Sequence, residues 1–167
     1  MMKNITHSFE FQEFGSSAEL MVSDQELLES ARAATASAYA PYSHYHVGAA
    51  VKLANGKVFS GSNQENMAFP AGLCAERVAV FAASSNFPDV AITAIAITAK
   101  AETFEVTEPV PPCGMCRQAI VEYEMKFNQN IRIILSGEKG KVLIIDGMNK
   151  LLPFMFFEIG LVNSGKK

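Results

Sequence analysis

Three cysteines form the part of this sequence with the clearest capacity for chemistry. They are Cys74, Cys113 and Cys116, and the chain has no others. Cys113 and Cys116 are three positions apart, so on a helix their thiolates project to the same side and can hold one tetrahedral ion. Cys74 supplies a third thiolate and leaves the fourth position of the ion open for water, which is typical of a catalytic zinc rather than a structural one.

Glu76 follows Cys74 by two residues, so its carboxylate can take a proton from water on the metal. Zinc nucleobase deaminases have a related pattern, His-x-Glu and then Pro-Cys-x-x-Cys, in which Cys can replace His and Glu is the general acid/base. This chain has Cys74-Ala75-Glu76 and then Pro112-Cys113-Gly114-Met115-Cys116. The sequence therefore predicts a catalytic zinc with a glutamate that carries protons.

Two other interpretations of the cysteines are open. A redox Cys-x-x-Cys pair is expected near the start of a βαβ unit, and it would leave Cys74 and Glu76 without a role. A structural zinc would need a fourth protein ligand, for which the candidates are the histidines. His7, His44 and His46 all lie far upstream and none is adjacent to a cysteine. Solvated or core positions are the ordinary roles of such histidines.

Several further blocks of sequence, in the same order, resemble the small homotetrameric cytidine deaminases that hold zinc through three cysteines. The blocks are Tyr-Ala-Pro-Tyr-Ser at 39–43, Val-Gly-Ala at 47–49, Asn-Gln-Glu-Asn at 63–66, Cys-Ala-Glu-Arg at 74–77, Pro-Cys-Gly-Met-Cys-Arg-Gln at 112–118 and Leu-Leu-Pro at 151–153. The resemblance covers roughly residues 24–160. It implies an α/β fold of three layers, α/β/α, with a mixed five-stranded sheet whose last two strands are antiparallel.

The same resemblance implies a reaction, the hydrolytic deamination of cytidine and 2′-deoxycytidine to uridine or deoxyuridine and ammonia, which belongs to pyrimidine salvage. One Zn²⁺ per subunit would be held by Cys74, Cys113 and Cys116. Glu76 would move a proton from water to ring N3 and then to the departing amine. Arg77 would offset the negative charge of the thiolates, together with the positive ends of the two helices. A plain surface role for Arg77 is the alternative.

Substrate contacts are implied by the resemblance at several positions. Asn63 and Glu65 would bind the ribose hydroxyls, and as an alternative they are turn residues that lead into Pro70. The backbone N–H of Ala75 and the carbonyl of Pro111 would lie near the pyrimidine and its leaving amine.

The base pocket departs from the family's habit at one point. The family often has Phe followed by Pro or Gln before Val-Gly-Ala, whereas this chain has Tyr45-His46. A tyrosine ring can still stack on a pyrimidine.

Shared active sites are a further implication of the resemblance. The run at residues 151–157 is strongly apolar and must be covered, either by the protein's own core or by another subunit. In the resembling tetramers a Phe three residues after Leu-Leu-Pro enters the base pocket of a neighbouring subunit, and Phe156 holds that position here. Phe69 is expected at another shared wall. We therefore expect a homotetramer.

Two rival functions remain. One is the same chemistry on a modified cytosine nucleoside or a nucleoside antibiotic such as blasticidin S, although Asn63 and Glu65 favour a plain ribose. The other is a zinc-binding or interaction protein without activity, against which Glu76 argues.

Composition is consistent with a small-molecule enzyme. The chain has 167 residues, 49% of them hydrophobic, which fits one globular domain, and we assign residues 1–20 to an N-terminal arm and 21–163 to the deaminase domain. A net charge of −3 without a run of Lys and Arg excludes a nucleic-acid track. The N-terminus lacks the apolar core of a signal peptide and the apolar runs are too short to span a bilayer. These features, with an odd number of cysteines, predict a cytoplasmic protein.

The elements that position these residues can be predicted in outline. A helix is expected from a capping box at Ser23 and Glu26 to Pro41, and Asn55-Gly56 predicts a hairpin. Further helices are expected at residues 73–85 and from Pro112 to 127, so both zinc-binding segments start helices. Strands are expected at residues 46–53, 57–62, 90–98, 131–135 and 142–146. The connection between the last two is too short for a parallel crossover, so they should pair antiparallel.

Overall fold

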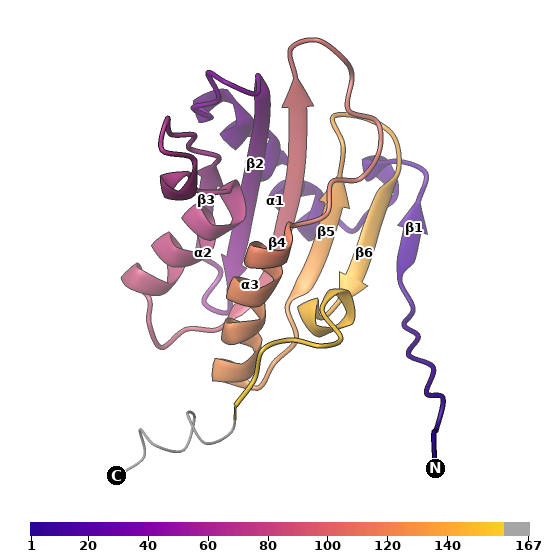
Figure 1. The fold of residues 1–167 in the computed structure, drawn as a ribbon. Helices are drawn as coiled ribbons and strands as arrows, with labels where there is room; N and C mark the ends of the chain where they lie inside the picture. The colour runs from indigo at the N-terminus through magenta and orange to yellow at the C-terminus, as the bar shows by residue number, and fades with distance from the viewer. Residues whose placement is uncertain (159–167) are drawn as a thin grey trace.

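The structure, a computed structural model, describes residues 1–158 and consists of one sheet between two layers of helices (Figure 1). The strands are β1 (Gln12–Phe14), β2 (Tyr45–Leu53), β3 (Val58–Ser62), β4 (Ile92–Ala101), β5 (Arg132–Ser136) and β6 (Val142–Asp146). The helices are α1 (Val22–Ala34), α2 (Ala75–Asn86) and α3 (Gly114–Phe127), and a short 3-10 helix, η4 (Met148–Leu151), follows β6. The α/β class is as predicted, and the expected domain end at 163 lies outside the described residues.

The sheet has the order β1-β6-β5-β4-β2-β3. Strands β4 and β5 are parallel and the other neighbours, including β5 and β6, are antiparallel. The prediction of five strands was wrong, because the N-terminal arm adds a sixth. Gln12 pairs with Ile144 and Phe14 with Val142, so β1 covers an edge of β6 that would otherwise present unpaired backbone groups.

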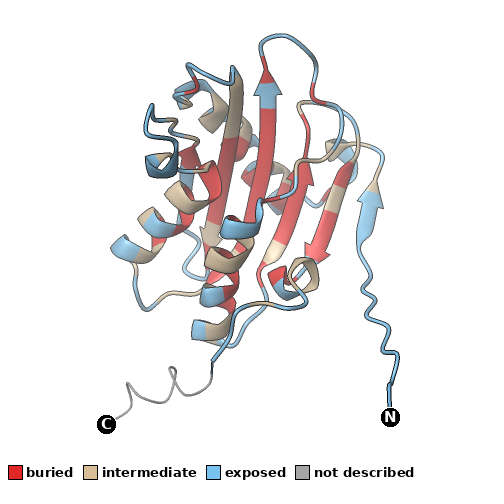
Figure 2. Ribbon diagram, viewed as in Figure 1, coloured by how far each residue is buried: buried red, intermediate tan, exposed pale blue. Residues whose placement is uncertain are grey.

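The central strands of the sheet are buried (Figure 2). Side chains along each strand point alternately toward the two helix layers. The face toward α2 and α3 carries large side chains such as Ile95, Ile97 and Ile133. The face toward α1 carries smaller ones, among them Ala50, Ala94 and Ala96. This difference brings α1 close to the sheet while a thicker core lies under α2 and α3.

Two glycines allow helices to approach the sheet closely. A Cβ at Gly48 of β2 would lie 2.0 Å from the carbonyl oxygen of Ala31 in α1. A Cβ at Gly61 of β3 would lie 2.7 Å from the carbonyl oxygen of Ala75 and 2.6 Å from the nitrogen of Ala79, both in α2. Because α2 begins at Ala75, the bare backbone of Gly61 sets the position at which that helix starts.

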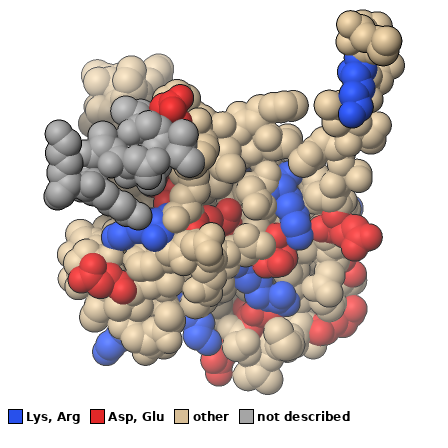
Figure 3. Space-filling model, turned by 90° about the horizontal axis from the view of Figure 1, so that it is seen from below, with Lys and Arg blue, Asp and Glu red and all other residues tan. Residues whose placement is uncertain are grey.

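The surface carries charges of both signs. On the face shown in Figure 3, acidic and basic side chains are interspersed rather than gathered into one patch of a single sign. Among the described residues, no helix is both long enough and apolar enough to cross a membrane.

Candidate active site

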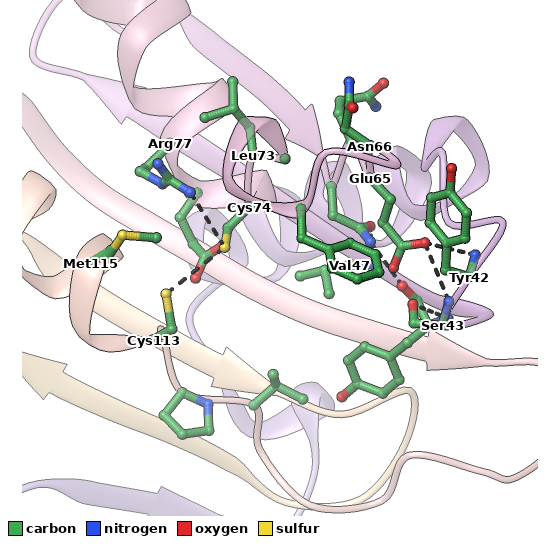
Figure 4. A pocket seen from close by; sticks show the side chains of 18 residues that line it. Tyr42, Ser43, Val47, Glu65, Asn66, Leu73, Cys74, Arg77, Cys113 and Met115 are labelled. Carbon is green, nitrogen blue, oxygen red and sulfur yellow. Dashed lines mark hydrogen bonds between the residues drawn. The ribbon is translucent and has the colours of Figure 1, made fainter.

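A cavity of about 770 Å³ opens where two helices begin beside the sheet. Its walls come from the turn before β2, the segment after β3, the first turn of α2 and the connection that leads into α3 (Figure 4). These four segments contain most of the residues that the sequence singled out. The lining residues with predicted roles are Tyr45, Asn63, Glu65, Phe69, Cys74, Glu76, Arg77, Pro111 and Cys113.

The two helix starts position the cysteines. Cys74 is the N-cap residue of α2 and Cys113 the N-cap residue of α3, both with extended backbone angles, while Cys116 lies in the first turn of α3. The predicted helix starts at 73 and Pro112 were therefore a residue or two early. The correction matters chemically, because an N-cap side chain lies beside the free N–H groups at the positive end of the helix.

The three sulfurs have the spacing of a metal site. The Sγ atom of Cys113 lies 3.8 Å from that of Cys74 and 3.5 Å from that of Cys116, and all three lie within 4.8 Å of one another. A disulfide would need a separation of about 2.05 Å. Tetrahedral zinc, with Zn–S bonds of about 2.3 Å, places its sulfurs about 3.8 Å apart. The donor set therefore fits zinc, and these sulfurs form the metal-ligand cluster found within residues 1–158.

Positive charge stabilises the thiolate at Cys74. The Arg77 guanidinium lies 3.9 Å from Cys74 Sγ (Figure 4). The pKa of Cys74 is lowered to about 5, first by a hydrogen bond with Cys116 and then by contacts with Arg77 and Cys113, against the opposing effect of burial. The thiol of Cys116 is the proton-holding partner, and its pKa is raised by the hydrogen bond with Cys74 and by burial. The Arg77 guanidinium therefore lies against the sulfur cluster, and its role in offsetting the thiolate charge stays a prediction.

Glu76 is a buried carboxyl group beside this cluster. Its side chain belongs to the first turn of α2, lines the cavity and is only 4% exposed. Burial raises the pKa of Glu76, and the charge of the neighbouring Cys74 raises it further. A carboxyl group with a raised pKa can both accept and return a proton, as general acid/base chemistry requires.

Glu65 is held by the turn before β2. Its Oε2 accepts the backbone N–H groups of Tyr42, at 2.9 Å, and Ser43, at 3.3 Å. The pKa of Glu65 is lowered by hydrogen bonds with the Ser43 side chain and with the Tyr42 backbone. Glu65 is therefore a fixed anion that has a second oxygen available for a hydroxyl group.

Asn63 serves the sheet as well as the cavity. Its Oδ1 accepts the backbone N–H of Val47 at 2.8 Å, and its Nδ2 donates to the carbonyl of Tyr45 at 2.9 Å. These two bonds hold the amide plane against the start of β2, with one N–H and one lone pair left over. Asn63 and Glu65 both line the cavity, and their contact with ribose hydroxyls stays a prediction.

Aromatic rings form the outer wall of the cavity. Tyr45 stacks on Phe104 of the β4–α3 connection, with ring centroids 6.3 Å apart and planes 26° apart. Tyr42 meets Phe69 edge to face at 5.9 Å. Tyr45 and Phe69 were expected at the cavity, whereas nothing in the sequence indicated Phe104 because it belongs to no motif.

Two predicted contacts lie apart from the cavity wall. Ala75 is fully buried, and Phe156 is not among the described residues that line the cavity. The backbone of Phe156 is instead tied to Gln118 of α3, whose Oε1 accepts the Phe156 N–H at 2.9 Å and whose Nε2 donates to its carbonyl at 3.0 Å. The Phe156 side chain is 73% exposed.

The C-terminal apolar run is divided between core and surface. Leu151, Leu152 and Met155 pack against the core beneath α3. Phe154 and Phe156 face outward. The protein's own core therefore covers part of this run, and coverage of the exposed part by another subunit stays a prediction.

The histidines take no part in the sulfur cluster. His44 and His46 both contact Glu102 at the end of β4, and His7 borders a separate cavity of about 340 Å³. Solvated positions were the ordinary expectation for them. Their shared partner Glu102 was not identified from the sequence, because a lone glutamate at a strand end gives no signal.

Comparison with known proteins agrees with this geometry. A family model described as the cytidine and deoxycytidylate deaminase zinc-binding region matches residues 21–128. A cytidine deaminase of Halalkalibacterium halodurans is 43% identical over 133 residues, which are 79% of this chain and 92% of that protein. A blasticidin-S deaminase of Bacillus cereus is 33% identical over 102 residues, 60% of this chain and 72% of that protein. The crystal structure of a cytidine deaminase from Burkholderia pseudomallei matches with a TM-score of 0.68 at 36% identity, over 78% of this chain and 97% of that one.

Proposed function

The chain belongs to the cytidine and deoxycytidylate deaminase zinc-binding family, and from this premise we propose that it converts cytidine and 2′-deoxycytidine, with water, to uridine or deoxyuridine and ammonia. The observation that carries the proposal is the juxtaposition of three sulfurs and one buried carboxyl group at the wall of one cavity. Neither a redox pair nor a structural zinc accounts for Glu76 in that place.

Cys74, Cys113 and Cys116 would hold the zinc ion, on the support of their spacing and of the lowered pKa of Cys74. When bound, zinc supplies Lewis acidity that makes water a nucleophile near neutral pH. Arg77 and the free N–H groups of the two helix starts offset the charge of the sulfurs. The three cysteines are free thiols that lie too far apart for a disulfide, which supports location in the reducing cytoplasm.

Glu76 would carry the protons of the reaction. It accepts a proton from the attacking water as oxygen bonds to C4, and delivers it to ring N3. It then accepts the second proton and passes it to the exocyclic amine, which leaves as ammonia while the C4 carbonyl forms. The buried position of Glu76 suits both transfers, because it shifts the pKa of the carboxyl group upward, toward the operating pH of a general acid/base.

The charges of the cavity favour a nucleoside over a nucleotide. Of the described residues that line it, the charged side chains are Glu65, Glu76 and Arg77. Arg77 is already engaged by Cys74, so a 5′-phosphate would meet two carboxylates without a free cation. Glu65 and Asn63 instead offer an acceptor and an amide for ribose hydroxyls, and Tyr45 offers a ring for the pyrimidine.

A homotetramer with shared active sites would complete the cavity. Its mouth is rimmed by exposed apolar side chains, notably Phe69 at 76% exposure and Met115 at 64%. Phe156 is equally exposed and its backbone is fixed by Gln118, one helical turn beyond Met115 on α3. A rigidly held and exposed aromatic ring of this kind suits insertion into a neighbouring subunit.

A nucleoside antibiotic is the second candidate substrate, on the strength of the relative from Bacillus cereus. The relative from Halalkalibacterium halodurans is more similar and covers more of the chain, which favours cytidine. Deamination of a panel decides between them: cytidine, deoxycytidine, cytosine, CMP, adenosine and blasticidin S, with zinc-loaded protein and absorbance detection. We expect turnover of the two cytosine nucleosides and little of the others. Preferred turnover of blasticidin S or CMP would contradict the proposal.

A further inference from the structure

The carboxylate of Glu102 bridges two imidazoles at the rim of the cavity. Its Oε2 lies 3.1 Å from Nδ1 of His44, and its Oε1 lies 3.0 Å from Nε2 of His46. The backbone joins the same groups, because the Glu102 N–H donates to the His44 carbonyl at 3.2 Å. Two histidines from one strand start are thus tied to the end of β4 by a single side chain.

The residue between the two histidines is Tyr45, which lines the cavity. The segment around it, residues 42–46, also carries the backbone N–H groups that hold Glu65. Within the segment, the Tyr45 N–H donates to Ser43 Oγ at 3.1 Å. Any movement of this segment would therefore displace both the ring expected on the pyrimidine and the carboxylate expected on the ribose.

The segment has a backbone conformation that needs support. His44 has a φ of 53°, in the left-handed region that residues other than glycine adopt uncommonly, although histidine is enriched there. It forms no part of a regular helix or strand. Surrounding contacts hold such a conformation, and here the His44 N–H donates to the Ala40 carbonyl at 3.0 Å while Glu102 contacts both the His44 ring and its carbonyl.

Glu102 also begins the connection that supports Tyr45 from behind. Phe104, two residues further on, stacks on the Tyr45 ring at 6.3 Å. The connection thus contacts residues 44–46 three times, at His44, Tyr45 and His46.

We propose that Glu102 is a positioning residue that fixes residues 42–46, and through them Tyr45 and Glu65, for nucleoside binding. The identity of the substrate in this inference rests on the proposed function, whereas the contacts of Glu102 do not. Glu102 is not among the described residues that line the cavity, whereas Cys74, Cys113 and Glu76 are, so it acts on substrate affinity and not on the chemical step. Losing it lowers the fraction of molecules that hold the binding-competent arrangement, and KM rises in proportion.

The charge on Glu102 strengthens the bridge, because a carboxylate accepts shorter and stronger hydrogen bonds than a neutral group does. Hydrogen bonds with His46 and the charges of both histidines lower the pKa of Glu102, and burial raises that of Tyr45.

Glu102→Gln tests the proposal, because it keeps the shape and removes the charge. KM for cytidine should rise about three- to tenfold, the range for two partly exposed charge-assisted hydrogen bonds, with kcat within about twofold of wild type. Glu105→Gln is the matched control, since Glu105 lies on the same connection, is similarly exposed and pairs with Lys139 instead. Its KM should equal that of wild type.

Hydrogen exchange provides a readout that does not depend on activity. Peptides covering residues 42–46 should exchange faster in Glu102→Gln than in wild type, and unchanged in Glu105→Gln. An unchanged KM, or a loss of kcat alone, would overturn the positioning role. If wild-type protein fails to deaminate cytidine while exchange still responds to Glu102→Gln, the proposed substrate is wrong and the positioning role stands.

Discussion

Replacing Glu76 by Gln separates proton transfer from everything else at the site. Gln has nearly the same size and shape, so the buried space beneath the cavity stays filled and α2 keeps its first turn. Glu76 is not one of the three cysteines of the cluster, although its side chain contacts Cys116. The substitution therefore removes a proton carrier without removing a zinc ligand or a packing contact.

The expected loss follows from the role. A positioned general acid/base contributes about 10²–10⁴-fold to the rate, equivalent to about 2.7–5.5 kcal/mol of transition-state stabilisation. Because Glu76 would transfer protons at two stages, we expect kcat for cytidine to fall toward the upper end of that range. The assay is the absorbance change on deamination, accompanied by zinc analysis and a thermal unfolding curve. Glu122→Gln, on the exposed side of α3, is the control for loss of one carboxylate and should be fully active.

Wild-type turnover in Glu76→Gln would refute the assignment of the proton carrier. Loss of zinc together with loss of turnover would also contradict the assignment, because it would show that Glu76 supports metal binding.

Four further outcomes are expected. Cys113→Ala should lose zinc, because its Sγ lies 3.8 Å from that of Cys74 and 3.5 Å from that of Cys116, and full zinc occupancy by metal analysis would count against the ligand set. Glu65→Ala should raise KM for cytidine about tenfold, as for a lost hydrogen bond to a charged group, with little change in Tm. Asn63→Ala should both raise KM and lower Tm, since it also loses its hydrogen bonds to Tyr45 and Val47. Equal turnover of cytosine and cytidine by the wild-type protein would contradict the ribose-binding role of both Glu65 and Asn63. Phe156→Ala should lower turnover and retain zinc. Light scattering should give the protein a mass four times that of the chain, whereas a fully active monomer would exclude shared active sites.

The sequence predicted the elements that short-range chemistry determines. Asn55-Gly56 marked the hairpin between β2 and β3, and the short connection before β6 required antiparallel pairing with β5. The prediction from the sequence was wrong at the start of α1, where the capping box expected at Ser23 does not form. The helix begins at Val22 with Met21 as N-cap, and Gln25 donates to the carbonyl of Leu20 instead.

Strand β1 could not be predicted for a related reason. It has three residues and little alternation, and it forms because β6 offers an open edge beside it. Its stability comes from a partner more than a hundred residues away along the chain, which no local pattern records.

The site shows the same division. The cysteines and Glu76 were predictable because metal ligation and proton transfer restrict residue type and spacing together. The contact between Glu102 and His46 joins positions 56 residues apart, and nothing restricts which residue types could make it. Groups that do chemistry therefore leave a pattern in the sequence, whereas groups that position them are found only when the chain is folded.

The starts of α2 and α3 combine a chemical role with a structural one. An N-cap is usually Ser, Thr, Asp or Asn, whose side chain satisfies a free N–H and stabilises the helix by about 0.5–2 kcal/mol relative to Ala. Here α2 and α3 both have Cys at that position, and neither side chain makes a capping hydrogen bond. The free N–H groups and the partial positive charge of each helix, about half an elementary charge, thus remain directed at the sulfurs. Together with Arg77 they would compensate the net negative charge of three thiolates around a divalent ion. On this proposal the two helices lack ordinary caps because those N–H groups serve the metal site, and the stability of a cap would be given up at the two positions where charge must be controlled.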